Sequence, residues 1–283
     1  MPIKLIASDL DGTIIDTNNQ IFANNFDAIT TIHNKNIPFA ICTGKTYSIT
    51  KDICKKFNAQ YGIFGNGSQI INLQTGEEIL RNILKKDDVI HCINIAREND
   101  LHVHLYTENE VITEKLMYMD LRNFEINKQN NLGLKFKLVS DIREYALTTK
   151  DDIFKTIISS EKSLNLAKTQ LESCSNFNVT LINKTGQYKD NVINKDYIYL
   201  DISPKNINKS FAISYLSNYL NLKNEDILSI GDNLNDLDMV KNSGIGVAVG
   251  DAYEELKSVA TYTTEKTASN GAFAEAIFKF IEK

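Results

Sequence analysis

Two aspartates that stand two residues apart are the first candidates for chemistry, in the stretch SDLDGT at residues 8–13. The apolar run before them, residues 3–7, predicts a buried strand that Gly12 ends. Residues i and i+2 of an extended chain project to the same side, which places Asp9 beside Asp11. Two like charges at that range need a cation or a shared proton, and Mg²⁺ prefers oxygen ligands. An ordinary turn is the alternative interpretation.

A second acidic stretch, GDNLND at residues 231–236, follows another apolar run that predicts a strand at residues 226–230. If a helix begins near Asn233, Asp232 and Asp236 lie four residues apart on one face of it. Helix capping by Asp and Asn is the competing interpretation. A cap needs one such residue rather than three within five positions, so we also expect chemistry here.

The elements that must position these carboxylates alternate between strand and helix. Strands are predicted at residues 3–7, 37–42, 61–64, 226–230 and 246–249, and helices at 24–34, 47–57, 206–220, 234–241 and 272–283. This order is typical of an α/β fold with a Rossmann-like, doubly wound parallel sheet. Ligands bind outside the carboxyl ends of such strands, where Asp9, Asp11, Thr43 and Asn66 all fall.

The pattern changes between the two acidic stretches. His102, His104 and Tyr106 share one face of a strand that alternates strictly, which predicts a half-buried strand. Further strands are predicted at residues 134–139, 153–159, 179–182 and 197–202, and helices at 88–99, 114–124 and 163–174. We therefore expect a core of residues 1–84 and 194–283, with an inserted α+β cap domain of residues 85–193 whose sheet is mostly antiparallel.

Composition narrows the class of protein. The 283 residues are 42% hydrophobic and 24% charged, and the net charge of −5 argues against broad binding to nucleic acid or a membrane surface. The four cysteines form no C-x-x-C pair, which favours free thiols in a reducing compartment. We see neither a signal peptide nor an apolar run of 18 residues, so we expect a cytoplasmic protein.

Four short motifs together resemble those of the haloacid dehalogenase (HAD) superfamily: DLDGT at residues 9–13, Thr43-Gly44, Lys209, and GDxxND at residues 231–236. Their order and the wide insert resemble the Cof-like, type IIB branch, which has a C2 cap. The resemblance implies a Mg²⁺-dependent phosphatase for phosphomonoesters of small metabolites, either sugar phosphates or a phosphorylated cofactor such as pyridoxal phosphate or FMN. A monomer or a homodimer would fit it.

The resemblance also implies a role for each matched residue. Asp9 would be the nucleophile that forms an aspartyl phosphate, and Asp11 the general acid and base. The phosphate would be bound by Thr43, Gly44, Lys209 and Asn235. The Mg²⁺ ion would be held by Asp9, the backbone carbonyl of Asp11 and Asp232, with Asp236 in support.

Lys209 also has an argument of its own. It falls in the first turn of a predicted helix, where the helix dipole disfavours a cation unless a phosphate or carboxylate lies nearby. Lys205 is the competing lysine, and Ser210 stands where the family often has glycine. Lys45 stands where arginine is common, which changes a bidentate contact into a point charge.

Five residues are candidates for contact with the substrate: Lys45, Asn66, His102, His104 and Tyr106. The alternatives are a plain Asn-Gly turn before a hairpin for Asn66, and a solvated sheet face or a His-x-His metal site for the histidines. Two other functions remain open, namely a phosphotransferase resembling phosphomannomutase and a non-catalytic module that binds a phosphorylated ligand. Such modules usually lose the nucleophile or a metal carboxylate, which this chain retains.

Overall fold

The computed structural model describes residues 2–16, 20–116, 135–160, 163–184 and 197–282. The chain divides into two compact units. The first, which we call the core unit, consists of Met1–Gly44, Ile53–Arg81 and Asn208–Lys283, and the second, the inserted unit, of Lys45–Asp52 and Asn82–Ile207. The boundaries expected from the sequence, at residues 84/85 and 193/194, stay a prediction.

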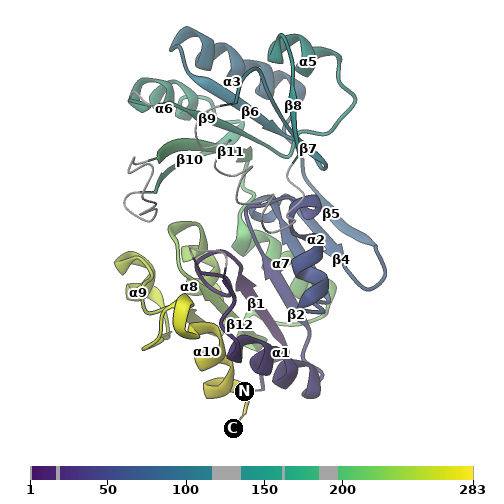
Figure 1. The fold of residues 1–283 in the computed structure, drawn as a ribbon, viewed down its shortest axis with the longest axis vertical. Helices are drawn as coiled ribbons and strands as arrows, with labels where there is room; N and C mark the ends of the chain where they lie inside the picture. Colours follow the sequence, from purple (N-terminus) through teal and green to yellow (C-terminus); the bar gives the residue numbers. More distant parts are fainter. Residues whose placement is uncertain (1, 17–19, 117–134, 161–162, 185–196, 283) are drawn as a thin grey trace. The chain divides into compact units, whose positions relative to one another are not determined.

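The core unit is built on a sheet with the strand order β14-β13-β12-β1-β2-β3-β4-β5 (Figure 1). Its parallel part contains β1 (Leu5–Asp9), β2 (Phe39–Cys42), β3 (Tyr61–Phe64), β12 (Ile227–Gly231), β13 (Ile245–Ala248) and β14 (Tyr262–Thr263). The strands β4 (Gln69–Asn72) and β5 (Glu78–Arg81) add an antiparallel hairpin at one edge. The central strand β1 is buried throughout and lies between β12 and β2.

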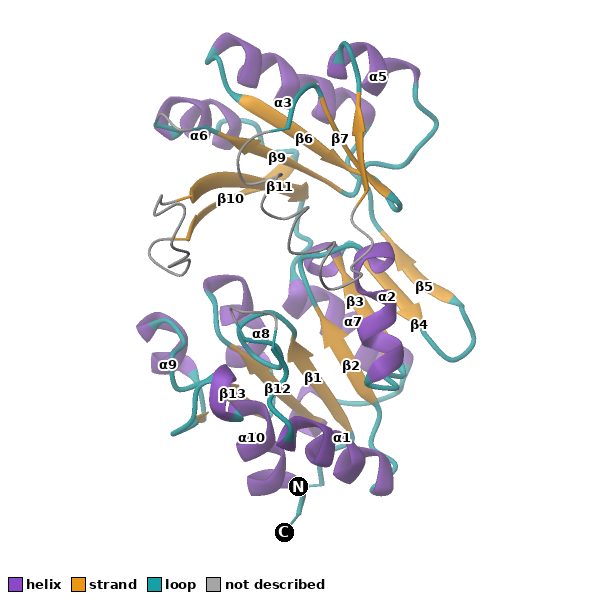
Figure 2. Ribbon diagram, in the orientation of Figure 1, coloured by secondary structure: helices purple, strands orange, loops and turns teal. Residues whose placement is uncertain are grey.

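Helices cover both faces of the core sheet (Figure 2). On one face α1 (Asn24–Asn34) packs against α10 (Ala272–Ile281), where the ring of Phe273 lies 5.9 Å from that of Phe39 on β2. On the other face α7 (Lys209–Tyr219) packs against α8 (Leu237–Asn242), and Ser229 of β12 donates to the Met239 carbonyl at 3.1 Å. The core unit also contains α9 (Glu254–Val259) and short 3-10 turns at Gly65–Gly67, Asn224–Asp226, Leu234–Asp236 and Ala268–Asn270, whereas α2 (Tyr47–Lys56) is divided between the two units.

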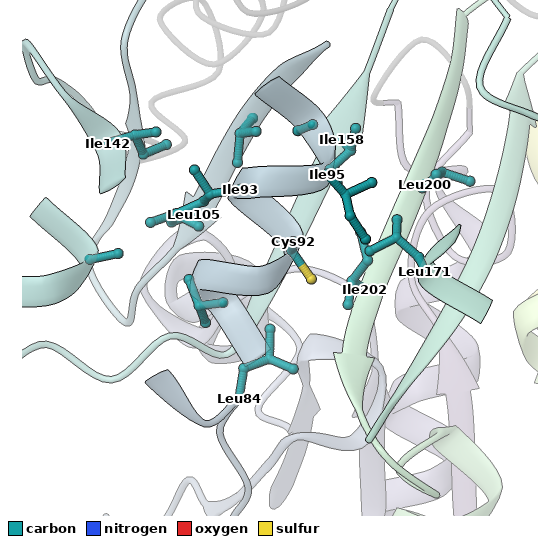
Figure 3. Close-up of a cluster of buried hydrophobic side chains, with 14 of the residues drawn as sticks. Leu84, Cys92, Ile93, Ile95, Leu105, Ile142, Ile158, Leu171, Leu200 and Ile202 are labelled. Atoms are coloured by element: carbon teal, nitrogen blue, oxygen red, sulfur yellow. The ribbon is translucent and has the colours of Figure 1, made fainter. Parts of the chain in front are cut away.

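The inserted unit has its own sheet, in the order β10-β11-β9-β6-β7-β8. Its strands are β6 (His102–Tyr106), β7 (Glu110–Thr113), β8 (Lys135–Leu138), β9 (Lys155–Ser159), β10 (Phe177–Lys184) and β11 (Tyr197–Pro204). All neighbours pair antiparallel except β7 with β8. One face carries α3 (Lys86–Glu98), α5 (Ile142–Thr148) and α6 (Asn165–Glu172), above a buried cluster that includes Cys92, Ile93, Leu105, Ile158 and Leu200 (Figure 3).

The expected α/β class is confirmed, and several elements differ from their predictions. Residues 114–116 are not helical, and the rest of the helix expected at 114–124, residues 117–124, lies outside the described residues. The Glu114 carboxylate instead accepts from the backbone N–H of Ile142 at 2.9 Å, at the start of α5. The hairpin β4–β5, the strand β7 and the helix α5 were not predicted. The helix expected at 234–241 begins as a 3-10 turn.

Strand β6 differs from its prediction in burial. His102 is 8% exposed and His104 is 2% exposed, so the interpretation as a solvated face is wrong. Neighbouring side chains enclose them: the Thr113 hydroxyl lies 3.1 Å from the His102 ring, and the two imidazoles meet edge to face at 4.5 Å. The alternation therefore does not mark a solvated face here, because a hydroxyl from the neighbouring strand β7 provides a hydrogen-bond partner for His102.

Candidate active site

The carboxyl end of β1 brings Asp9 into contact with a distant lysine. Lys209, the first residue of α7, is fully buried and its ammonium group donates to Oδ1 of Asp9 and, at 2.5 Å, to Oδ1 of Asp236. Asn208 before it caps the helix by accepting from the backbone N–H of Phe211 at 2.8 Å. The cation at this helix start is therefore compensated by two carboxylates. Lys205, the competing candidate, is exposed.

Three carboxylates gather at this edge of the sheet. Ligand atoms of Asp9, Asp232 and Asp236 all lie within 4.8 Å of one another. The pKa of Asp9 is raised to about 7, mainly by burial and also by the charges of Asp236 and Asp11, while the Lys209 ammonium opposes the shift. Burial, followed by the charges of Asp9 and Asp236, also raises the pKa of Asp232 well above its usual value. Such crowding of anions favours a cation among them.

The residues present fit a hard divalent cation, because the donors are carboxylate oxygens without sulfur or imidazole. Asp236 differs from the other two. One of its oxygens contacts Lys209, and the other accepts from the backbone N–H groups of Asp232 and Asn233, both at 3.1 Å. Asp236 therefore fits both interpretations of the GDNLND stretch: it bonds to backbone N–H groups as a capping residue does, and it belongs to the acidic cluster. Asp9 and Asp232 are the side chains that would hold the ion directly.

Two neighbours of Asp232 were given no role from the sequence. The buried hydroxyl of Thr13 donates to Oδ1 of Asp232 at 3.2 Å. At Gly12 the backbone is left-handed with φ +90°, and a Cβ there would lie 2.4 Å from Oδ2 of Asp232. Both residues belong to the DLDGT motif, so the signal was present in the sequence, but only the fold reveals their contact with a residue 219 positions away.

The loops after β2 and β3 are bonded to each other and to the loop after β12. Thr43 is buried, and its carbonyl accepts from the backbone N–H of Asn66 at 3.1 Å. Asn66 lies in the turn between β3 and β4, as the hairpin interpretation expected. Its side chain also accepts a hydrogen bond from Asn235 at 3.1 Å. Thus Thr43, Asn66 and Asn235 are brought together.

The other predicted site residues are not part of these contacts. The carboxylate of Asp11 is not one of the three in the cluster among the described residues, although its charge raises the pKa of Asp9. Lys45 falls within Lys45–Asp52 of the inserted unit. In that same unit the Lys155 ammonium donates to Asp201 at 2.9 Å and lies 4.9 Å from the centre of the Tyr106 ring. This ion pair was not anticipated.

Comparison with known proteins supports this fold and defines the family. A family model described as haloacid dehalogenase-like hydrolase matches residues 6–277, so the chain belongs to the haloacid dehalogenase-like hydrolase family. The family and enzyme class expected from the sequence are therefore confirmed.

Relatives match the chain over nearly its whole length. A Bacillus subtilis 5-amino-6-(5-phospho-D-ribitylamino)uracil phosphatase is 25% identical, over 97% of this chain and 94% of its own. The structure of a haloacid dehalogenase-like hydrolase from Bacteroides thetaiotaomicron is 25% identical, with a TM-score of 0.81 over 98% of this chain and 99% of that one. A HAD subclass IIB sugar phosphatase shares the fold at 17% identity, with a TM-score of 0.77 and 98% of both chains covered.

No helix among the described residues is both long enough and apolar enough to span a membrane.

Proposed function

We propose that this chain is a Mg²⁺-dependent phosphatase that hydrolyses phosphomonoesters of small metabolites through an aspartyl phosphate on Asp9. The observation that carries the proposal is the buried Asp9 carboxylate held between Lys209 and the acidic pair Asp232 and Asp236. A nucleophile that must approach an anionic phosphate needs compensating positive charge, which Lys209 and a cation held by Asp9 and Asp232 would provide together. Bound Mg²⁺ would screen the carboxylate from the phosphate and polarise the phosphoryl oxygen.

Each of the chain's own residues at the site then has a separate role in the reaction. Asp9 attacks phosphorus, and its bond to phosphorus forms as the ester oxygen leaves with a proton from Asp11. Asp11, then ionised, takes a proton from the water that cleaves the aspartyl phosphate and releases inorganic phosphate. Thr43, the Gly44 backbone and Asn235 bind phosphoryl oxygens. Lys209 fixes the position of Asp9 and balances the charge of the cluster.

We further propose that the inserted unit selects the substrate, through the sheet face that bears Tyr106, His104, Lys155 and Asp201. The support is a buried ion pair on a sheet face that also carries an aromatic ring and an imidazole, a set suited to a polar, phosphorylated molecule. The Thr113 hydroxyl lies 3.1 Å from the His102 ring, and His104 and Tyr106 are the residues of this face that we select for the test. A sugar phosphate and a phosphorylated cofactor are both compatible with these groups. The four free cysteines support a cytoplasmic setting.

The first experiment is phosphate release from a panel of sugar phosphates, nucleotides, pyridoxal phosphate and FMN, with and without Mg²⁺. We expect release that requires Mg²⁺ and is abolished by Asp9→Asn, whereas Asp27→Asn on the exposed part of α1 keeps the wild-type rate. Appreciable turnover by Asp9→Asn would refute the nucleophile. Transfer of phosphate within or between substrates, without release, would identify a mutase, and binding without turnover a non-catalytic module.

For the inserted unit, His104→Ala and Tyr106→Phe are compared with wild type on the best substrate of the panel. We expect a raised KM with kcat retained, because neither side chain belongs to the core unit that carries the acidic cluster. Unchanged kinetics in both variants would exclude this face from substrate selection.

A further inference from the structure

The three-residue turn between β3 and β4, Gly65–Gly67, contacts two segments of the core unit that carry site residues. Through the backbone of Asn66 it bonds to the carbonyl of Thr43 at 3.1 Å. Through Gly67 it meets the start of α7, where an added Cβ would lie only 2.4 Å from the carbonyl oxygen of Asn208. Asn208 directly precedes Lys209. The turn is therefore packed between the Thr43 loop and the helix that supplies the lysine.

Asn66 is unusual among the residues that share its backbone conformation. The described non-glycine residues with positive φ are Asn36, Asn58, Asn66, Asp100, Asn206 and Asn221, and Asn66 is the one among them that is not exposed. Asparagine tolerates the left-handed region, but glycine adopts it at less cost. The backbone alone therefore does not require a side chain at position 66, and the use of that side chain follows from its contacts.

The side chain of Asn66 contacts Asn235 in the GDxxND motif. Its Oδ1 accepts a hydrogen bond from Nδ2 of Asn235 at 3.1 Å, joining the loop after β3 to the loop after β12. A primary amide has an acceptor at one end and donors at the other. Because the NH₂ end of Asn235 is used by Asn66, the rotation of the Asn235 amide is fixed, and its carbonyl end is directed away from that bond.

The same amide packs against Gly44. The three nearest atoms to a Cβ added at Gly44 are all in the Asn66 side chain, with Oδ1 at 3.0 Å, Nδ2 at 3.3 Å and Cγ at 3.4 Å. A methyl group at position 44 would thus press first on the amide of Asn66. Gly44, Asn66 and Asn235 form a continuous series of contacts, in which each residue limits the position of the next.

We propose that Asn66 is a positioning residue, which orients the amide of Asn235 against the Thr43-Gly44 loop and thereby sets the affinity of the site for a phosphoryl group. The inference rests on the proposed function, because contact of Thr43, Gly44 and Asn235 with phosphate is part of it. Asn66 acts through Asn235, since the hydrogen bond that carries the argument joins those two side chains.

The test begins with Asn66→Gly, which keeps the left-handed turn and removes the amide. The Mg²⁺-loaded full chain is assayed for hydrolysis of p-nitrophenyl phosphate, and inorganic phosphate is titrated into it by calorimetry. We expect KM and the Kd for phosphate to rise about tenfold, the value of one hydrogen bond, with kcat and Tm little changed. Asn58→Gly is the matched control, since Asn58 has φ 47° and is exposed.

Gly44→Ala supplies the second variant. The atoms nearest to its methyl group all belong to the Asn66 amide, so it should raise the Kd for phosphate as Asn66→Gly does. Once the amide is gone, these nearest atoms are absent, and Gly44→Ala in the Asn66→Gly background should add less than a twofold loss. Residues that act through one contact are non-additive in this way, whereas unrelated structural damage adds.

Each outcome is decisive. Wild-type kinetics and phosphate affinity in Asn66→Gly, or full additivity of Asn66→Gly with Gly44→Ala, would overturn the positioning role while leaving the phosphatase intact. Wild-type protein that neither hydrolyses p-nitrophenyl phosphate nor binds phosphate would overturn the proposed function and this inference with it. If Asn66→Gly lowers Tm in proportion to its loss of phosphate affinity, and Asn58→Gly does not lower Tm, Asn66 has a structural role rather than a positioning role.

Discussion

At the scale of single residues, the site depends on a lysine that has no contact with water. Lys209 is 0% exposed, and its partners Asp9 and Asp236 are both buried. Burial lowers the pKa of this lysine, but the two carboxylates raise it by more than burial lowers it. The net effect is a pKa above the usual value for lysine. If the Lys209 ammonium is removed, the buried carboxylates lose their compensating charge, and the folded state is strongly destabilised.

We therefore predict that Lys209→Met lowers the free energy of unfolding by about 3–5 kcal/mol, the usual cost of leaving a buried charge unpaired. Urea denaturation of the metal-free protein measures it. Lys205→Met is the control, since Lys205 is exposed and four residues away, and should change stability by less than about 0.5 kcal/mol. Equal effects of the two substitutions would mean that the buried contacts of Lys209 contribute nothing to the free energy of unfolding.

A second prediction concerns Gly12, whose missing side chain makes room for the Asp232 carboxylate. Gly12→Ala should weaken Mg²⁺ binding at least tenfold, because the new Cβ lies 2.4 Å from Oδ2 of Asp232 in the present geometry. Isothermal titration with Mg²⁺ measures this. Gly76→Ala is the matched control. Gly76 also has a positive φ, +77°, but an added Cβ there has nothing within 4 Å. Similar metal affinity in the two variants would contradict the prediction.

At the scale of secondary structure, the strand ends were predictable and the contacts across the fold were not. Apolar runs place Asp9 at the end of β1 and Gly231 at the end of β12, because continuous burial selects continuous hydrophobicity. The partners of Lys209 lie 200 and 27 residues away from it, and no local pattern encodes such pairs. The Asn66 to Asn235 bond, across 169 residues, is of the same kind.

The elements that were missed are short and partly polar. Strand β5 has four residues, Glu78–Arg81, two of them charged, so it lacks the alternation that marks a strand. Helix α5 did have a signal: Asp141 accepts from the backbone N–H groups of Arg143 and Glu144, as an N-cap does. Glu114 was assigned to a helix of its own, whereas its carboxylate contacts Arg97 and the start of α5. Only the tertiary structure distinguishes these uses of a carboxylate.

The buried cluster of the inserted unit gives a prediction for its central strand and helix. Leu105 of β6 is 0% exposed, so Leu105→Ala should cost about 2–5 kcal/mol, from lost transfer energy and the cavity left behind. Amide hydrogen exchange in β6, β9 and α3 measures the loss. Leu166→Ala on α6, where the side chain is 64% exposed, makes the same chemical change at the surface. Protection that falls equally in both variants would argue against a close-packed cluster.

At the scale of the whole molecule, the acidic cluster and the inserted sheet belong to different compact units. Asp9, Asp232, Asp236 and Lys209 all come from the core unit, which is assembled from three segments of the chain. The inserted unit has a hydrophobic cluster of its own. Binding of a cation to the core unit is therefore expected to stabilise that unit rather than the whole chain.

We predict that Mg²⁺ at a hundred times its Kd raises the stability of the core unit by about 2.7 kcal/mol, as linkage requires for a ligand that binds only the folded state. Amide exchange should slow in β1 and β12 but not in β9 or α3, which lie in the inserted unit. Asp232→Asn should remove the effect. Uniform slowing through both units, or slowing that persists in Asp232→Asn, would show that the ion acts elsewhere.

The pairing of β1 with β12, in which Leu5 stands opposite Ile227, has a consequence for synthesis on the ribosome. The strand that carries Asp9 is made about 220 residues before its neighbour β12. At about 10 residues per second, β1 waits roughly 20 seconds for that neighbour. Meanwhile Asn82–Ile207 emerges as one unbroken segment with its own sheet. The inserted unit can thus fold while the nascent chain is still attached, whereas the acidic cluster is completed only after Asp232 and Asp236 have been made.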